Sequence, residues 1–288
     1  MRVLVTGASG MLARAVAEQC RVLGDEVFAY DRRALDVTDA AAIKAVFERE
    51  RPETIINCAA WTDVDGCEGN AEQAFAANAR APELLAIHSR EIGASLITVS
   101  TDYVFDGAKK GFYTQRDDPR PTSVYGASKL AGERLAQAAS ARTVVVRTGW
   151  IFGAGGRNFL SRVVELYKGG AQLKAISDAY GTPTSAVDLA ARLRELAELD
   201  LPGVYHVVNA GAGASFEEFA RAALAAAGMD DSRLETVSMD SLPRPAPRPR
   251  NSRLHCLISE HIGLAPLPDW RAALHNFVET KLRAGSVS

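Results

Sequence analysis

Tyr125 and Lys129 are the two residues of this chain whose types and spacing most directly suggest chemistry. They stand four positions apart in the stretch Ser-Val-Tyr-Gly-Ala-Ser-Lys-Leu, and on a helix this spacing puts both side chains on one face. An unperturbed phenol has a pKa near ~10, and a neighbouring ammonium favours the phenolate and lowers that pKa toward the working range of an acid–base catalyst. The pair therefore indicates a phenol tuned for proton transfer.

A glycine-rich turn far upstream gives the pair its meaning. Residues 5–10 read Val-Thr-Gly-Ala-Ser-Gly, directly after an apolar run and before an amphipathic stretch. In a dinucleotide fingerprint such glycines allow a tight turn and close approach to the pyrophosphate, which faces the N-terminus of the next helix. The alternative, an ordinary strand–helix turn, is disfavoured because strand, turn, helix and the following strand occur in order. Ala13 replaces the third glycine and still permits close packing. A tuned phenol with a dinucleotide site suggests hydride chemistry.

The residues after the second predicted strand give opposing indications about the cofactor. Asp31 suits the adenosine ribose hydroxyls and favours NAD, whereas Arg32 and Arg33 could pair with a 2′-phosphate and favour NADP. A solvated turn is the alternative interpretation of the arginines. We expect NADPH or NADH, with NADPH favoured.

The elements that position these motifs alternate between strand and helix. Near-continuous apolar runs predict strands at 1–6, 26–30, 54–58, 95–100 and 143–148, and helical periodicity falls between them at 11–23, 40–51, 71–92 and 125–139. Buried strands alternating with helices are typical of a parallel sheet covered on both faces. The sequence therefore predicts an α/β fold with a Rossmann-type doubly wound sheet.

Beyond residue 148 the alternation loosens. Helices are predicted at 158–168, 186–199, 216–227 and 270–284, with strands at 173–176 and 204–208, the latter able to rejoin the main sheet. Four prolines within 242–249 exclude a regular helix or ladder and predict an extended segment. We expect an NAD(P)-binding Rossmann domain over 1–150, with 177–210 returning to it. Residues 151–176 and 211–288 would form a smaller substrate-binding lobe.

Composition narrows the class of protein. The chain has 288 residues, 47% hydrophobic and 24% charged, with a net charge of −2. This gives no electrostatic footprint for nucleic acid, and no apolar run approaches the ~20 residues that span a membrane. The opening strand leaves no room for a signal peptide, so a cytoplasmic location is expected. Cysteines 20, 58, 67 and 256 show no CxxC or zinc spacing, and reduced thiols are expected; a redox pair of Cys58 and Cys67 is the alternative.

Thr101 completes a set that resembles a known superfamily. It follows the fourth predicted strand, where a hydroxyl can face a ligand and donate to a carbonyl that also receives the proton of Tyr125. Thr101, Tyr125 and Lys129 together resemble the extended short-chain dehydrogenase/reductases. Further stretches, in order along nearly the whole chain, resemble the dTDP-4-dehydrorhamnose reductase family: 57–65, 100–107, 124–133, 147–152, 181–184, 203–206 and 248–254.

The resemblance implies an activity and a set of site residues. A dTDP-sugar would be the substrate, and hydride from NAD(P)H would reduce dTDP-4-dehydro-6-deoxy-L-mannose to dTDP-L-rhamnose. Catalysis would fall to Thr101, Tyr125 and Lys129. The implied cofactor contacts are Gly7, Gly10, Met11, Leu12, Asp31, Arg32, Asp36, Val37, Ala59, Ala60, Trp61, Thr62, Asn78, Tyr125 and Lys129. The implied substrate contacts are Thr101, Asp102, Val104, Phe105, Tyr125, Trp150, Asn158 and Arg248.

Several of these residues have a purely structural alternative. Trp150 could belong to the core, Arg248 could be a solvated linker charge, and Asn78 could serve helix packing. The acidic run of Asp63, Asp65 and Glu68 could suggest a metal, but a solvated acidic turn is favoured.

Two departures from family patterns bear on metal and reaction. Some members bridge a dimer with magnesium through acidic residues, where this chain has Ala15 and Val187. Magnesium is therefore doubtful, no metal ligand is assigned, and monomer and homodimer both stay open. Related dehydratases carry Glu where this chain has Tyr103, which disfavours water elimination. A reductase or epimerase of another nucleotide 4-keto-6-deoxy sugar stays open. So does a non-catalytic, cofactor-binding regulatory subunit, although the retained catalytic set argues against it.

Overall fold

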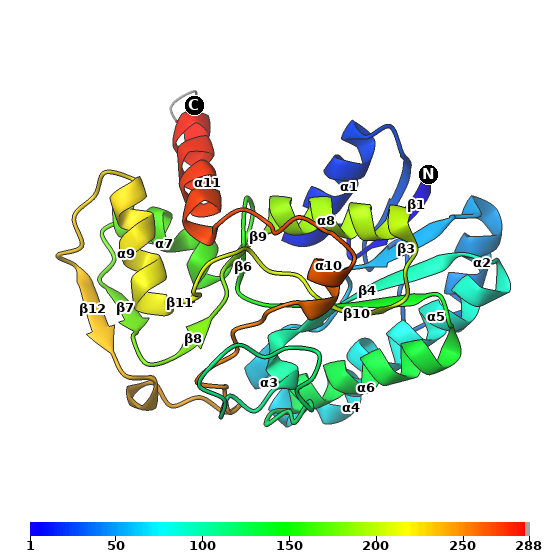
Figure 1. Cartoon of the computed structure of the whole chain (residues 1–288), viewed down its shortest axis with the longest axis horizontal. Coiled ribbons are helices and arrows are strands. Elements are labelled where there is room, and N and C mark those ends of the chain that lie inside the picture. The colour runs from blue at the N-terminus through cyan, green and yellow to red at the C-terminus, as the bar shows by residue number, and fades with distance from the viewer. Residues whose placement is uncertain (286–288) are drawn as a thin grey trace.

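A six-stranded parallel sheet forms the larger lobe of the computed structural model, which describes residues 1–285 (Figure 1). The strand order is β10-β5-β4-β3-β1-β2. The order reverses between β1 and β3, which is the place where doubly wound sheets open a binding crevice. The predicted fold class is confirmed. The strands span Arg2–Thr6 (β1), Glu26–Tyr30 (β2), Thr54–Asn57 (β3), Ser95–Thr101 (β4), Thr143–Thr148 (β5) and Gly203–His206 (β10).

Helices cover both faces of this sheet because successive side chains of each strand point to opposite sides. Val3 and Val5 pack with residues of α1 (Met11–Val22) and α8 (Ala186–Leu199). Leu4, between them, packs on the other face. That face is covered by α2 (Ala40–Glu50), α5 (Ala81–Glu91) and α6 (Val124–Ala139).

The predicted helix at 71–92 is interrupted in the structure. It consists of α4 (Ala71–Phe75), a π-helical turn (Ala76–Arg80) and α5 in direct succession. Single π turns inside helices occur frequently at functional sites, and this one contains Asn78. Before it lies a short helix not anticipated from sequence, α3 (Val64–Gly69), whose first turn is capped by the Asp63 carboxylate accepting from the Gly66 amide.

A smaller lobe lies beside the sheet with a core of its own (Figure 1). The fully buried Trp270 and Phe219 belong to this core. It is built from α7 (Phe159–Lys168), α9 (Phe216–Ala226), α11 (Trp270–Gly285) and the parallel strands β7 (Leu173–Ile176) and β12 (Leu234–Val237). Short pairs complete it: β6 (Ile151–Phe152) with β9 (Thr184–Ser185), and β8 (Tyr180–Gly181) with β11 (Ala214–Ser215).

The chain passes between the lobes more than once. β10 returns to the sheet and pairs with β5 in parallel, as its sequence predicted. Residues 242–249 have no regular structure, also as predicted, and lead to the short helix α10 (Leu257–His261). Within residues 1–285 no helix combines the length and apolarity needed to cross a bilayer.

Candidate active site

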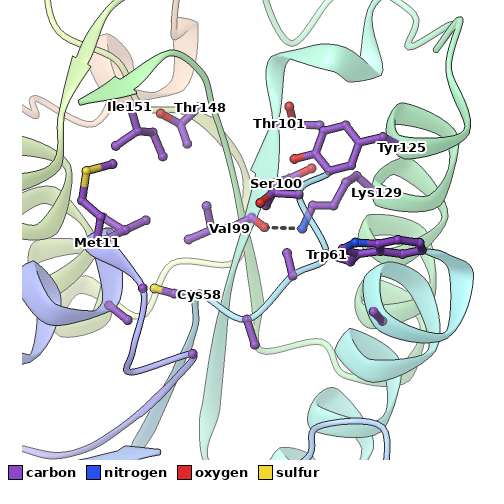
Figure 2. A pocket seen from close by; sticks show the side chains of 18 of the residues that line it. Met11, Cys58, Trp61, Val99, Ser100, Thr101, Tyr125, Lys129, Thr148 and Ile151 are labelled. Atoms are coloured by element: carbon purple, nitrogen blue, oxygen red, sulfur yellow. Dashed lines mark hydrogen bonds between the residues drawn. The ribbon is translucent and has the colours of Figure 1, made fainter. Parts of the chain in front are cut away.

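A cavity of about 840 Å³ opens at the carboxyl ends of the central strands (Figure 2). Its lining comes from the segments at the ends of β1, β2, β3, β4 and β5. Residues of α6 in the larger lobe and of α7 and α9 in the smaller lobe also line it. This is the edge at which open α/β sheets bind ligands. The residues singled out from the sequence can therefore be located relative to one cavity.

The glycine turn has the geometry that a dinucleotide requires. Gly7 has a φ of +73°, and a Cβ there would lie 2.9 Å from the backbone nitrogen of Ala59. Gly10 precedes α1 without a side-chain cap, so the first amides of the helix are available to an anion. Gly7, Gly10, Met11 and Leu12 all line the cavity. These features fit a pyrophosphate, as predicted for a dinucleotide site.

The acid expected to hold the adenosine ribose is engaged elsewhere. Asp31 accepts bonds from the amides of Arg33 and Ala34, both at 3.0 Å, and does not line the cavity. Both bonds are to Oδ1, so the carboxylate caps its own turn through one oxygen, and its contact with the cofactor stays a prediction. Arg32, Asp36 and Val37 do line the cavity.

The loop after β3 lies in the cavity, and Asn78 holds it there. Ala59, Ala60, Trp61 and Thr62 line the cavity. Asn78 is only 1% exposed and does not line it. Its Oδ1 accepts from the Trp61 amide at 2.8 Å, and its Nδ2 donates to the Trp61 carbonyl at 3.0 Å and to Ser128 Oγ at 3.1 Å. Asn78 therefore positions the loop rather than contacting a cofactor, because the π turn directs it inward.

Thr101, Tyr125 and Lys129 meet on the floor of the cavity. Figure 2 shows the Thr101 hydroxyl beside the Tyr125 phenol, with Lys129 below them. The Lys129 ammonium donates to the Val99 carbonyl at 2.7 Å. Burial lowers the pKa of Lys129 to about 8, against the opposing charge of Glu133. Lys129 is therefore a cation at neutral pH, close to losing its charge.

The electrostatics of the phenol differ from the expectation. Burial raises the pKa of Tyr125 well above its usual value, and the Thr101 hydroxyl opposes this only in part. The lowering expected from Lys129 does not outweigh burial in this structure, where the ammonium donates to the Val99 carbonyl. A phenol is protonated at neutral pH even at its ordinary pKa near ~10, so Tyr125 is a proton donor rather than a base.

A buried ion pair lies directly behind this floor. Arg147 on β5 makes a bidentate contact to Glu133 on α6, with Nη2 at 2.7 Å and Nε at 3.0 Å, and Ser100 Oγ donates to the same carboxylate. Each member adjoins a cavity residue: Ser100 precedes Thr101, Arg147 precedes Thr148, and Glu133 is one helical turn from Lys129. The network thereby fixes β4, β5 and α6 relative to one another.

Two polar groups in the cavity lack a protein partner among the described residues. They are Asp102 Oδ2 and Thr148 Oγ1. The Thr101 hydroxyl donates to the other carboxyl oxygen of Asp102 at 3.1 Å. Burial raises the pKa of Asp102 to about 6. A hydrogen bond from the Ser252 side chain opposes this rise. Asp102 lines the cavity but is only 3% exposed, and its contact with substrate stays a prediction.

Trp150 stands where the main cavity meets a second one of about 260 Å³. Its φ of +51° is unusual for a bulky residue, and such outliers often mark functional sites. One face of the indole stacks on Phe216, with centroids 3.9 Å apart. At Gly181, a Cβ would lie 2.1 Å from the ring, so only glycine leaves room for it. Trp150, Phe216 and Tyr103 line both cavities, and Trp150 is therefore a wall residue rather than core.

The remaining residues predicted to contact substrate lie in three different places: the main cavity, the core and the second cavity. Asn158 lines the main cavity while its Oδ1 caps α7. Val104 and Phe105 are fully buried, and Phe105 stacks on Tyr113 with centroids 4.3 Å apart. They lie in the core because the 3₁₀ turn after β4 directs them away from the cavity, which corrects the prediction that they contact substrate. Arg248 lines the second cavity, not the main one.

The acidic run at 63–68 has structural partners rather than a metal or solvent alone. Asp63 caps α3, Glu68 accepts from the Val124 amide at 2.8 Å, and Asp65 pairs with Arg248. The run is a partly solvated turn, as predicted, in which each carboxylate also has a partner in the protein. Within residues 1–285, no group of three or more His, Cys, Asp or Glu side chains could hold a metal ion. All four cysteines are free, and burial raises the pKa of Cys58 to about 12.

Sequence reasoning missed several lining residues. Phe216 and Val99 line the cavity but carry no motif of their own, because apolar residues at strand ends and helix starts are usually core. Cys58 also lines it and lies in the stretch 57–65, but no contact was predicted for it. Thr148 could have been predicted from the sequence, since it ends a predicted strand and Thr101 also follows one.

Fold and site together define an NAD(P)-dependent oxidoreductase of the short-chain dehydrogenase/reductase type. Residues 1–283 match the family described as the RmlD substrate binding domain, and the chain belongs to that family of NAD(P)-dependent dTDP-4-keto-sugar reductases. It is 39% identical over 279 residues to a dTDP-4-dehydrorhamnose reductase of Streptomyces griseus, covering 95% of this chain and 91% of the relative.

Two further comparisons bear on substrate and cofactor. A dTDP-4-keto-6-deoxy-D-glucose reductase of Streptomyces niveus is 35% identical over 274 residues, with 95% of each chain covered. The crystal structure of dTDP-4-dehydrorhamnose reductase from Bacillus anthracis in complex with NADP superposes with a TM-score of 0.92. It is 33% identical and covers 96% of this chain and 98% of that one.

Proposed function

We propose that this protein reduces dTDP-4-dehydro-6-deoxy-L-mannose (dTDP-4-dehydrorhamnose) at C4 to dTDP-L-rhamnose, with NADPH as the reductant. The observation that carries the proposal is the meeting of Thr101, Tyr125 and Lys129 in one cavity that adjoins a second cavity at Trp150. A sugar at the catalytic residues would extend its nucleotide past Trp150. The relative from Streptomyces griseus, named for this reaction, supports the choice of sugar.

The protein's own residues would handle the proton. A bound reduced nicotinamide supplies the hydride for C4 of the sugar. Tyr125 holds its proton at neutral pH, as an ordinary phenol does, and it gives that proton to the carbonyl oxygen as negative charge develops there. The Thr101 hydroxyl donates to the same oxygen and orients it. The Lys129 ammonium, charged below a pKa of about 8, stabilises the phenolate that remains.

The choice of NADPH rests on the adenosine end of the cavity. Arg32 lines it, whereas Asp31, the residue that would select the free ribose hydroxyls of NADH, does not line it and accepts from two amides through Oδ1. A guanidinium suits a phosphate monoester because it presents several donors in one plane. The relative from Bacillus anthracis, whose structure contains NADP, supports the same choice.

A second candidate is reduction of another dTDP-4-keto-6-deoxy sugar with the same residues. The relative from Streptomyces niveus, named for a different sugar, favours keeping it. The two candidates differ only in the side chains that meet the sugar hydroxyls, and a fold does not decide such specificity.

The test is incubation of the purified full chain with a panel of dTDP-4-keto-6-deoxy sugars and either NADPH or NADH. NADPH consumption is followed by absorbance, and products are identified by NMR. The proposal expects dTDP-L-rhamnose, with NADPH preferred. Faster reduction of another sugar would establish the second candidate. Isomerisation without net loss of NADPH would indicate an epimerase, and cofactor binding without turnover of any sugar would indicate a regulatory subunit.

A further inference from the structure

Residues 242–249, here called the proline-rich wall, form one side of the second cavity. The wall includes Leu242, Ala246 and Arg248, and across the cavity stand Tyr103, Trp150 and Phe216. The latter three also line the main cavity. A ligand that extends from the catalytic floor past Trp150 therefore meets this wall next.

The wall has few means of holding its own position. Proline occupies every second place, at 243, 245, 247 and 249, and each proline removes a backbone donor. Prolines also restrict the chain to few conformations, so an anchor at one residue sets the position of its neighbours. The C-terminal end is tethered to the smaller lobe, where the Arg250 carbonyl accepts from the Tyr180 amide at 2.7 Å.

The middle of the wall is anchored by a carboxylate of the larger lobe, and the Tyr103 phenol also has a hydrogen bond with Arg248. Asp65 Oδ1 accepts from the Ala246 amide at 3.0 Å and from Arg248 Nη1 at 2.5 Å, and Asp65 Oδ2 accepts from Arg248 Nη2 at 2.8 Å. Arg248 Nη1 also donates to the Ala246 carbonyl at 2.8 Å. The Ala246 residue is 2% exposed and the Arg248 side chain 12%. Three contacts from a segment some 180 positions away thus converge on a single side chain.

Asp65 also lies close to the catalytic floor. It is the second residue of α3, and α3 follows the cavity loop that contains Trp61 and Thr62. Residues Trp61, Val64 and Cys67 pack against Tyr125 in one apolar cluster. The carboxylate therefore joins the wall of the second cavity to the element that packs on the catalytic tyrosine.

We propose that Asp65 is a positioning residue for the nucleotide part of the substrate, because it holds the proline-rich wall at a set distance from Trp150. The identity of the substrate in this proposal rests on the proposed function. The role of Asp65 in holding the wall does not depend on it. It also gives Arg248 a role other than direct binding of the diphosphate. The Arg248 guanidinium pairs with Asp65 and so attaches the wall to the larger lobe.

The experiment compares the full-length protein with Asp65→Asn, Asp65→Glu and a control, Asp200→Asn. Asp200 forms a comparable ion pair with Arg142, and its side chain is 37% exposed against 35% for Asp65. Two measurements need no turnover: amide hydrogen exchange of residues 242–249, where Ala246 reports the Asp65 bond directly, and the Kd of dTDP by calorimetry. The third is the separation of kcat from KM for the dTDP-4-keto sugar at saturating NADPH.

Asp65→Asn is expected to speed exchange at Ala246, to weaken dTDP binding about fivefold and to raise KM by a similar factor, as loss of a partly exposed anchor predicts. The values of kcat and the NADPH Kd should hold, Asp65→Glu should recover part of the affinity, and Asp200→Asn should match the original protein.

Two results would overturn the anchor role. Unchanged dTDP affinity in Asp65→Asn would show that the wall's position does not govern binding. Tighter dTDP binding would show that Asp65 competes with the diphosphate for Arg248. If the original protein reduced no keto sugar, the proposed function would fall, while the exchange and dTDP comparisons would still decide the role of Asp65.

Discussion

The catalytic floor and the proline-rich wall are held in place by different kinds of contact. The floor stands on β4, β5 and α6, and the Glu133–Arg147 pair behind it is buried, with side chains 3% and 7% exposed. The wall has neither strand nor helix, and its anchor on the larger lobe is the partly exposed pair of Asp65 and Arg248.

The two ion pairs differ in the free energy that they contribute, and this difference matches the different tasks of the floor and the wall. Breaking a buried ion pair costs about 3–5 kcal/mol, whereas exposed pairs contribute about 0–1 kcal/mol. Proton transfer needs fixed geometry among three side chains, so a costly buried network suits the floor. A wall held by a weaker contact can change in sequence without loss of the fold.

The largest effect is expected from removing the proton donor of the floor. Tyr125→Phe should lower kcat about 10³-fold, because general acid catalysis typically contributes about 10²–10⁴-fold. Binding of NADPH, followed by fluorescence titration, should change far less. Turnover close to that of the original protein would remove Tyr125 from the mechanism.

Breaking the network behind the floor tests the comparison through stability. Glu133→Gln leaves the buried Arg147 guanidinium without its counter-charge, and the free energy of unfolding in urea should fall by about 3–5 kcal/mol. Asp65→Asn, measured alongside, should lose less than about 1 kcal/mol. Equal losses would contradict the distinction between floor and wall. If Glu133→Gln does not fold, Ser100→Ala, which removes only the hydroxyl donor, gives a milder form of the same test.

The buried Asp102 carboxylate is expected to lower the free energy of unfolding of the protein at neutral pH. Burial raises its folded pKa to about 6 from 3.8, so the folded state favours the protonated carboxyl. Stability linked to this group is present at low pH and is lost as pH rises through 6.

Asp102→Asn should therefore raise the free energy of unfolding at pH 8 by about 1–3 kcal/mol, and the gain should shrink at pH 5. Urea unfolding at both pH values measures it. A gain independent of pH would mean that the carboxylate charge is not its source.

The smallest effect concerns the pH range over which the floor stays charged. The pKa of Lys129, lowered to about 8 by burial, predicts that kcat/KM falls about tenfold per pH unit above that value, since kcat/KM reports the free enzyme. Ser100→Ala leaves the Glu133 charge in place, and its kcat/KM should fall above the same pH. A decrease in kcat/KM that begins only near pH ~10 would indicate that Lys129 has an ordinary pKa.

Local sequence was sufficient for most elements and for the chemistry of the floor. Helical and strand periodicity, with Gly7 between them, depend on neighbours within one or two turns, and the predicted bounds agree with the structure to within about two residues. Thr101, Tyr125 and Lys129 meet because each follows from its position on a predictable strand or helix. Asn78 was missed as a positioning residue because a π turn has no strong local signal.

The sequence by itself therefore determined the order of the elements, the class of fold and the three side chains of the floor, since these follow from spacing along the chain. Only the tertiary structure decided that Phe105 enters the core, that the Tyr125 pKa is raised rather than lowered, and that Asp65 holds Arg248. Each of these depends on burial or on a partner far away in the chain. Such contacts are set by how whole elements pack, and no local pattern records them.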